Sequence, residues 1–425
     1  MVRLSALSVL GSPVRLCRTL ACLALSAAAV APAAAQPADA AAGTAPRSPA
    51  GLHAPSARWQ RLPSPTVGRQ VAPAGTPSAS SSAAAASTCP VPAPTTAAGW
   101  QAGFDALNDD TWSGADQGSS LRLPDGRVLW VFDDTFQGAQ APDGSRAAGT
   151  RVVRNSLVLS DRGCLRGVTG PGGAEVLPGT AGQWYWPLHA FLDGGRLFLS
   201  ASRVAQDATG AFVTSGTWLA ELSLPAGGTP TFRALSRTPS SGTPETTAQW
   251  GTAIAQAGGW TYVYGTQRVD QPYVFGKALY VARVPAGKVT ALSAWRFWNG
   301  RGWVAGAAQA RAIRPAVGGV STSLSVWRAA PGSWRAVTKK DDWLGSQVVL
   351  LRAPSPTGPW TETVLASSPS YARPGETTYN AFAHPGLALS GGALLVSVSR
   401  NNDDFGAHLR DADLYKPQFT SSPVR

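Results

Sequence analysis

Two acidic residues flank a predicted β-hairpin near the start of the strand-rich region. Asp116 ends the segment Trp-Ser-Gly-Ala-Asp before the first strand, and Asp134 lies in Phe-Asp-Asp-Thr-Phe at the end of the second. Because paired hairpin strands are antiparallel, these two positions lie at the same end of the hairpin. Two carboxyl groups at one site can act as acid and base in cleaving a glycosidic bond. The pattern predicts a catalytic pair, with turn capping or pairing to Arg154 as the structural alternative.

Other acidic residues are weaker candidates. Asp133 is next to Asp134, and alternation along a strand is expected to point it to the opposite face. Glu245 and Glu376 lie in loops and are candidates for a third acid. The aspartates of Asp-Gly turns are explained by local hydrogen bonding; these are Asp125, Asp143 and Asp193.

The hairpin rule places further polar and aromatic residues at the same end of the later repeats. Such a set of amides, rings and cations suits a sugar polymer, whose faces stack on aromatic side chains. The alternatives are a structural imidazole for each histidine and a core position for each tryptophan. The sequence has no nucleophile elbow, zinc-binding or phosphate-loop motif, so we expect no cofactor and no metal. The predicted substrate-binding residues are Trp186, His189, Arg203, Gln249, Trp250, Gln267, Tyr379, Asn380, His384 and Asn401.

These residues must be positioned by an all-β domain with an internal repeat. Short Val, Leu, Tyr and Trp runs alternate with Gly, Pro, Asp and Asn, and no long helical period appears. Four segments share a Gly-containing turn followed by a strand, and a weaker fifth copy surrounds Val320. Their spacing of about 60 to 73 residues fits one four-stranded blade each. The repeat predicts a five-bladed β-propeller, with a two-sheet jelly roll as the alternative and residues 412–419 as a possible closing segment.

The chain before this domain has two parts with different compositions. Residues 1–35 carry three arginines, no acid and a short apolar run before Ala-Ala-Ala, which predicts a secretory signal peptide. Residues 36–97 are dominated by Ala, Pro and Ser and predict a disordered linker. Residues 98–425 are the predicted propeller. We expect a secreted, extracellular protein without integral membrane contact, a lipid anchor at Cys22 being a minor alternative.

Charge and cysteine content narrow the class of partner. The net charge of +12 falls to +9 without the signal arginines, and no basic run is longer than Lys339-Lys340. A nucleic-acid-binding protein would concentrate its charge in a patch, so an anionic envelope or polysaccharide is the expected partner. Only Cys89 and Cys164 remain after cleavage, and an exported pair is most simply one disulfide. The oligomeric state is left open.

Several motifs taken together resemble a known family. They are the two aspartate segments, Gly358-Pro359-Trp360, Tyr-Asn-Ala-Phe-Ala-His-Pro at 379–385 and Asp-Ala-Asp-Leu-Tyr at 411–415. The region from about Gly99 to Phe419 resembles bacterial endo-D-arabinanases of glycoside hydrolase family 183, first catalogued as a domain of unknown function. The resemblance implies a five-bladed propeller that cleaves internal D-arabinofuranosyl linkages of arabinogalactan and lipoarabinomannan. It also implies that Asp116 and Asp134 are catalytic.

The resemblance further implies inversion at the sugar carbon, with Asp116 provisionally the base and Asp134 the acid. The reverse assignment fits the sequence equally well, and a shorter separation of the carboxyl groups would indicate retention. Family members commonly have Gly before the second aspartate, where this chain has Asp133. A neighbouring carboxylate raises the pKa of one member of such a pair. The alternative function is a non-catalytic propeller that binds carbohydrate or the cell envelope.

Overall fold

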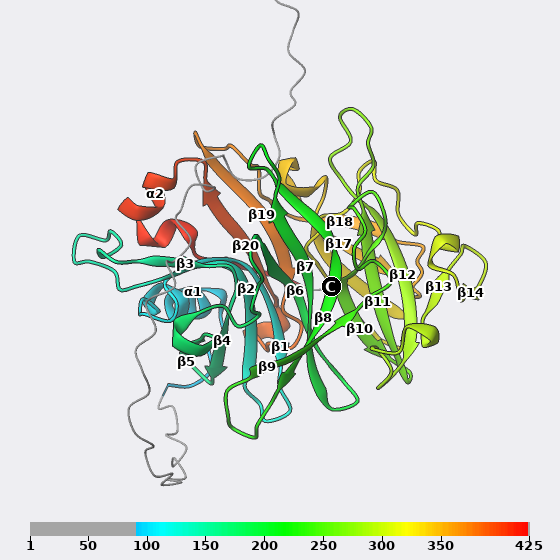
Figure 1. Cartoon of the computed structure of the whole chain (residues 1–425), viewed down its shortest axis with the longest axis horizontal. Helices are drawn as coiled ribbons and strands as arrows, with labels where there is room; N and C mark the ends of the chain where they lie inside the picture. The colour runs from blue at the N-terminus through cyan, green and yellow to red at the C-terminus, as the bar shows by residue number, and fades with distance from the viewer. Residues whose placement is uncertain (1–90, 424–425) are drawn as a thin grey trace, which may run out of the picture. The chain divides into compact units, whose positions relative to one another are not determined.

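The computed structural model describes residues 91–423, whose strands form five antiparallel sheets (Figure 1). Each sheet begins with the strand nearest the centre and continues outward through short connections, as the repeated turn and strand pattern predicts. The predicted signal peptide, most of the predicted linker and Cys89 lie outside the described residues. Within residues 91–423, no helix is both long enough and apolar enough to cross a bilayer.

Each of the five sheets is formed by strands that follow one another in the chain. The first sheet contains β1 (Ala115–Arg122), β2 (Val128–Gln137), β3 (Arg151–Val153), β4 (Ser156–Asp161) and β5 (Cys164–Val168). The second contains β6 (Gln183–Asp193), β7 (Arg196–Gln206), β8 (Phe212–Ser223) and β9 (Thr231–Arg237). The third contains β10 (Gln249–Ala257), β11 (Trp260–Gln267), β12 (Ala278–Pro285), β13 (Arg296–Trp298) and β14 (Trp303–Val304). The fourth contains β15 (Leu324–Ala330), β16 (Ser333–Lys339), β17 (Gln347–Ala353) and β18 (Thr361–Ser367). The fifth contains β19 (Glu376–Ala383), β20 (Leu394–Asn402) and β21 (Gln418–Ser422).

The helices are short and lie in the connections and at the ends of the described region. They are α1 (Ala97–Ala106), α2 (Phe405–Arg410) and the 3-10 turns η2 (Pro171–Gly173), η3 (Leu292–Ala294), η4 (Ala307–Gln309), η5 (Asp342–Leu344), η6 (Ser390–Gly392) and η7 (Ala412–Tyr415).

The five sheets close into a ring through their innermost strands. In chain order β1 contacts β6, β6 contacts β10, β10 contacts β15, and β15 contacts β19. The circle closes where β19 and β20 contact β1, and Figure 1 shows the orange and red strands of the last sheet beside the cyan strands of the first. This arrangement confirms the predicted five-bladed β-propeller. A closed ring shields the inner strand edges from pairing with other chains.

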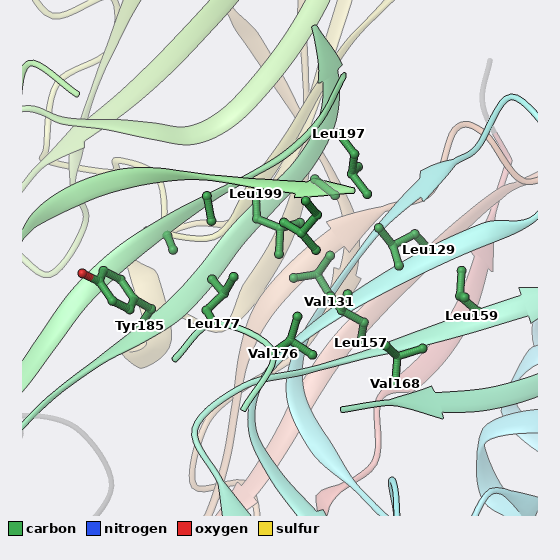
Figure 2. Packing of buried hydrophobic residues seen from close by; sticks show 14 of the residues in the cluster. Leu129, Val131, Leu157, Leu159, Val168, Val176, Leu177, Tyr185, Leu197 and Leu199 are labelled. Atoms are coloured by element: carbon green, nitrogen blue, oxygen red, sulfur yellow. The ribbon is translucent and has the colours of Figure 1, made fainter. Parts of the chain in front are cut away.

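Apolar side chains fill the space between neighbouring sheets. Figure 2 shows one such cluster, in which Leu129 and Val131 of β2 lie near Leu197 and Leu199 of β7. All four side chains are fully buried. Complete burial of each contributes roughly 1.5–3 kcal/mol to folding relative to exposure. Packing of this kind fixes the angle between blades, and with it the relative positions of residues on different inner strands.

The end of the chain packs against the first sheet, as predicted, while its last strand joins the fifth sheet. The final strand β21 pairs with β20 of the fifth sheet, so no strand of the first sheet is supplied by the C-terminal segment. Phe419 instead packs its ring against Phe104, 5.4 Å away between centroids, and against Trp130, 5.6 Å away. The two ends of the described chain are therefore joined by aromatic packing.

The fifth predicted repeat copy, around Val320, does not contain the hairpin turn of its sheet. The turns before Arg127, Arg196, Trp260 and Ala393 do join the first two strands of their sheets. The glycines before Val320 precede β15, and the hairpin turn of the fourth sheet is at Pro331 and Gly332. The Gly-Gly pattern marks a sharp turn in both places, because glycine adopts positive φ without strain, and so it did not distinguish them.

The helix α1 was not expected from the sequence. Its N-cap is Thr96, whose hydroxyl accepts a hydrogen bond from the Gly99 amide at 3.0 Å. Trp100 and Phe104, four residues apart on one face, are buried against Trp130. Ten residues are too few for a clear helical period, and the packing of these two rings stabilises the helix instead.

Candidate active site

A β-bulge brings three carboxyl groups together at one end of the first sheet. Ala115 pairs with Thr135 and Gln117 pairs with Phe132, so the single residue Asp116 faces two residues, Asp133 and Asp134. The extra residue in β2 interrupts the strict alternation of side chains along that strand. Asp133 is buried, and its carboxyl group interacts electrostatically with both Asp116 and Asp134, so alternation along the strand does not separate it from them.

The neighbouring residue Gln117 fixes this end of β1 at the centre of the ring. It has a positive φ of 74°, which is unusual for a residue with a side chain. Its side-chain amide donates to the Leu188 carbonyl and accepts from the Ser323 hydroxyl, both at 3.0 Å. Its backbone amide donates to the Ser399 hydroxyl at 3.0 Å. Bonds to the second sheet, to the fifth sheet and to the residue before β15 hold the strained backbone, and they place Asp116 beside it.

Burial and mutual repulsion change the acidity of the three aspartates. Burial is the largest cause that raises the pKa of Asp116 to about 7, and the negative charge of Asp134 is the second. Hydrogen bonds from Tyr379 and Tyr415 act in the opposite direction. Burial and the charges of Asp116 and Asp134 raise the pKa of Asp133 well above its ordinary range. Two like charges in a dry site cannot both form easily, so the cluster retains protons at pH values where free carboxyl groups have lost them.

Asp134 is the member of the cluster with a cationic partner. Its carboxylate accepts a hydrogen bond from the Trp186 indole at 3.0 Å and pairs with the Arg154 guanidinium at 3.3 Å. Burial raises the pKa of Asp134, while Arg154 and Trp186 act in the opposite direction. The Arg154 guanidinium also lies 4.5 Å from the centre of the Trp184 ring. The ionised form of Asp134 is therefore stabilised more than that of its neighbours.

Asp116 is held by a tyrosine from the fifth sheet. The Tyr379 hydroxyl donates to Asp116 Oδ2 at 2.7 Å, and the Asn401 side-chain amide donates to that hydroxyl oxygen at 3.1 Å. Tyr415 of η7 is buried and also lowers the pKa of Asp116 by hydrogen bonding. Predicted residues Trp186, Tyr379 and Asn401 thus converge on the aspartates.

The turn that carries Tyr415 is tied to the first sheet by Arg146. This buried guanidinium donates to the Ser113 carbonyl at 2.7 Å and to the Ala412 carbonyl at 3.0 Å. Gly114 lies against it with φ 139°, and a Cβ there would be 2.7 Å from Arg146 Nη2 and 2.8 Å from the Tyr415 carbonyl oxygen. Only glycine fits this close approach.

The two predicted histidines lie away from the aspartates. His384 is fully buried, with Nδ1 2.8 Å from the Ser120 hydroxyl and Nε2 2.9 Å from the Ser397 hydroxyl. Both ring nitrogens therefore have protein partners. His189 lines a cavity of about 410 Å³ between the C-terminal halves of the five innermost strands, whereas Asp116 lies at the N-terminal end of β1. A second cavity of about 370 Å³ adjoins it near Trp327. No carboxyl group is among the residues that line these two cavities.

The remaining predicted substrate-binding residues make contacts within the protein. Trp250 is buried and packs on Phe297 with 5.0 Å between ring centroids. The Gln249 side-chain amide donates to the backbone carbonyls of Pro244 at 2.8 Å and Thr247 at 2.9 Å. Gln267 donates to the Thr246 carbonyl, and Arg203 donates to the Ser215 hydroxyl at 2.8 Å. Asn380 has φ 50° within the irregular stretch of β19.

The two weaker acid candidates also have other partners. Glu245 lies 3.7 Å from Arg268 and 3.9 Å from Lys277, and Glu376 lies 3.6 Å from Arg373. Cys164 is disulfide-bonded, and Cys89, its predicted partner, is outside the described residues.

Sequence reasoning missed three residues of this site. The sequence pattern shows Tyr415 only as part of a motif, places Asp133 on the opposite face by alternation, and does not point to His408. It indicates only a structural role for Arg154. A bulge and a contact across about 300 residues leave no periodic pattern, so local spacing could not have found these residues.

Comparisons with known proteins agree with the propeller fold. A crystal structure described as a "putative hydrolase" from Bacteroides ovatus has a TM-score of 0.59 and 20% identity, over 76% of this chain and 88% of that one. Notoamide biosynthesis cluster protein J from Aspergillus sp. (strain MF297-2) is 29% identical over 144 residues, which are 33% of this chain. The match spans only 36% of that relative's length. The model of a family described as "Domain of unknown function (DUF5005)" matches residues 104–422, about three quarters of the chain. The protein therefore belongs to the DUF5005 family.

Proposed function

We propose that this protein is a secreted glycoside hydrolase that cleaves internal D-arabinofuranosyl linkages of arabinogalactan or lipoarabinomannan. The observation that carries the proposal is the pair Asp116 and Asp134 at one end of the propeller, where burial raises the pKa of both carboxyl groups and a cation, Arg154, faces only Asp134. Two carboxyl groups with different environments are what an acid and base mechanism at a sugar carbon requires. The description of the Bacteroides ovatus structure as a hydrolase agrees with this class.

The environments support specific roles for the two aspartates. Asp116, with a pKa of about 7, is protonated below neutral pH and about half protonated at neutral pH, and it is the proposed general acid for the leaving oxygen. Asp134 faces Arg154 and Trp186, which favour its ionised form, and is the proposed base that activates water. This assignment reverses the provisional one made from the family resemblance. Proton donation by Asp116 and proton removal by Asp134 in one step would invert the sugar carbon.

Aromatic side chains beside the pair suit a carbohydrate ligand. The ring of Trp186 is 5.1 Å from that of Phe212 and 6.1 Å from that of Trp184, in edge-to-face arrangements. Trp186 and Phe212 are both partly exposed. Rings fixed in this way offer apolar surfaces to sugar faces at little cost in side-chain entropy. Trp186 can both contact a sugar and position the proposed base, because its indole nitrogen donates a hydrogen bond to Asp134.

The test is incubation of the purified mature protein with arabinogalactan, followed by sizing of the products. We expect oligosaccharides of intermediate length early in the reaction, because an endo-acting enzyme cuts inside the polymer. Release of single arabinose units alone would contradict the endo mode. Tight binding with an unchanged polymer would contradict hydrolysis and favour the envelope-binding alternative. An arabinan of L-arabinofuranose serves as the matched polymer control and should remain intact.

A further inference from the structure

The short helix α2 places a histidine near the proposed acid. The helix begins after Asp404, whose carboxylate accepts a hydrogen bond from the Gly406 amide at 2.9 Å. His408 is fully buried, with its ring centroid 5.1 Å from that of Tyr415 and 6.1 Å from that of Phe136. A neutral histidine in such a place is most useful as a fixed hydrogen-bond donor or acceptor.

His408 is the start of a hydrogen-bonded chain that ends at Asp116. Its Nε2 lies 2.8 Å from Asn401 Oδ1. Asn401 Nδ2 donates to the Tyr379 hydroxyl oxygen at 3.1 Å, and the Tyr379 hydroxyl donates to Asp116 Oδ2 at 2.7 Å. The chain crosses from α2 through β20 and β19 to β1.

The direction of this chain follows from one backbone contact. The Asn402 amide donates to Asn401 Oδ1 at 2.7 Å, so this atom of the side-chain amide is the acceptor oxygen. His408 Nε2 also lies 3.1 Å from the Asn402 carbonyl oxygen and 3.2 Å from the Asn402 amide, whose shorter hydrogen bond is to Asn401 Oδ1. Two acceptor oxygens around Nε2 favour the tautomer in which Nε2 carries the hydrogen. Each member then donates to the next, from His408 to Asn401 to Tyr379 to Asp116. Donors aligned in one direction polarise and strengthen one another.

We propose that His408 is a positioning residue that holds the carboxyl group of Asp116 in one orientation through Asn401 and Tyr379. The role rests on the proposed function, in which Asp116 is the acid. It does not require His408 to touch the substrate.

The charges around His408 are compatible with a hydrogen-bond donor whose charge stays constant over the pH range in which Asp116 titrates. Burial lowers the pKa of His408 to about 4, so its ring is neutral at pH values where Asp116 changes charge. The titratable and charged groups that face Asp116 are Asp133 and Asp134 of β2, Tyr379 of β19 and Tyr415 of η7, and those that face His408 are Arg146, Arg400 and Asp404.

The test is a titration of the Asp116 carboxyl carbon by NMR in the full chain, assigned with Asp116→Asn. His408→Leu removes the donor but keeps apolar volume, and it should raise the pKa of Asp116 by about half a unit. His408→Gln places an amide donor near Asn401 and should restore the titration of the unmodified protein. His384→Leu, in which an equally buried imidazole away from Asp116 is lost, is the control and should leave that titration unchanged.

The outcomes separate the positioning role from the proposed function. If His408→Leu does not fold, Asn401→Ala removes the next donor and should give the same upward shift. An unchanged Asp116 titration in a folded His408→Leu or Asn401→Ala variant would overturn the positioning role, as would failure of His408→Gln to restore it. Because the titration needs no substrate, a shifted titration without any cleavage would contradict the proposed function and leave the positioning inference standing.

Discussion

The hydroxyl of Tyr379 donates a 2.7 Å hydrogen bond to Asp116 although the two residues are 263 positions apart. One is on the last innermost strand and the other on the first, so the contact exists only when the ring of five sheets is closed. A donor to a carboxylate favours its ionised form. The closure of the fold therefore acts directly on the acidity of the proposed catalytic acid.

Replacing this donor should change the pH dependence of cleavage. In Tyr379→Phe the pKa of Asp116 should rise by about one unit, since hydrogen bonds to charged groups contribute roughly 1.5–3 kcal/mol. A general acid must be protonated, so the loss of activity on raising the pH should move to higher pH. Rates of cleavage measured from pH 5 to 9 check this. Tyr262→Phe is the control, and an alkaline limit that stays in place in Tyr379→Phe would refute the link.

Asp133 should lower the stability of the folded protein at high pH, where its carboxyl group loses its proton. Its pKa is raised well above the ordinary 3.8, so the folded state holds this proton more tightly than the unfolded state. Stability from this proton is complete below about pH 3.8 and is lost as the pH rises through the higher folded-state value. Each unit of the difference corresponds to about 1.4 kcal/mol. Asp133→Asn should therefore melt at a higher temperature than the unmodified protein at pH 8, and the gain should shrink towards pH 4. A lower melting temperature at pH 8 would count against this account.

The convergence of Asp116 and Asp134 was predictable, because a hairpin is a local structure. Asp116 and Asp134 are joined by one short turn, and antiparallel pairing alone places them at the same end. Asp133 was misjudged because a bulge depends on one unmatched residue in β2, which the sequence pattern does not reveal. Tyr415 and His408 come from segments about 300 residues away, and only closure of the ring brings them near. The internal repeat predicted the correct number of blades. The copy around Val320 was assigned to the wrong turn, because two Gly-containing turns lie close together in the fourth repeat.

Asp193 has a structural role, but its hydrogen-bond partners are far along the chain and not within its own Asp-Gly turn, as the sequence had suggested. Its carboxylate accepts hydrogen bonds from the Thr261 hydroxyl at 2.9 Å, the Gly287 amide at 2.9 Å and the Val289 amide at 3.0 Å. These bonds connect the second sheet to the third. Asp193→Ala should destabilise the fold by roughly 2–4 kcal/mol, because buried donors lose a charged acceptor. Chemical denaturation checks this, with the exposed turn residue Asp143→Ala as the control. A loss below about 0.5 kcal/mol would show that the bonds contribute little.

Arg146 should be required for the position of Tyr415 and hence for the site. Arg146→Met keeps much of the apolar stem over the Phe136 ring, which lies 3.9 Å from the guanidinium carbon. It removes the donors to the Ser113 and Ala412 carbonyls. We expect a loss of stability of about 2–4 kcal/mol and reduced cleavage. Arg151→Met, at an exposed position of β3, is the control. Unchanged stability in Arg146→Met would contradict the assigned role of the guanidinium.

The most direct test of the account is the rate of arabinogalactan cleavage by Asp116→Asn and Asp134→Asn. Asparagine preserves the shape of each side chain and removes its proton chemistry. Both variants should remain folded by circular dichroism and should lose at least about 100-fold in cleavage rate, the smallest contribution typical of general acid or base catalysis. Asp143→Asn, in an exposed turn, should cleave like the unmodified protein. If both folded variants cut the polymer at nearly the unmodified rate, these aspartates are not the catalytic pair and the proposed function is wrong.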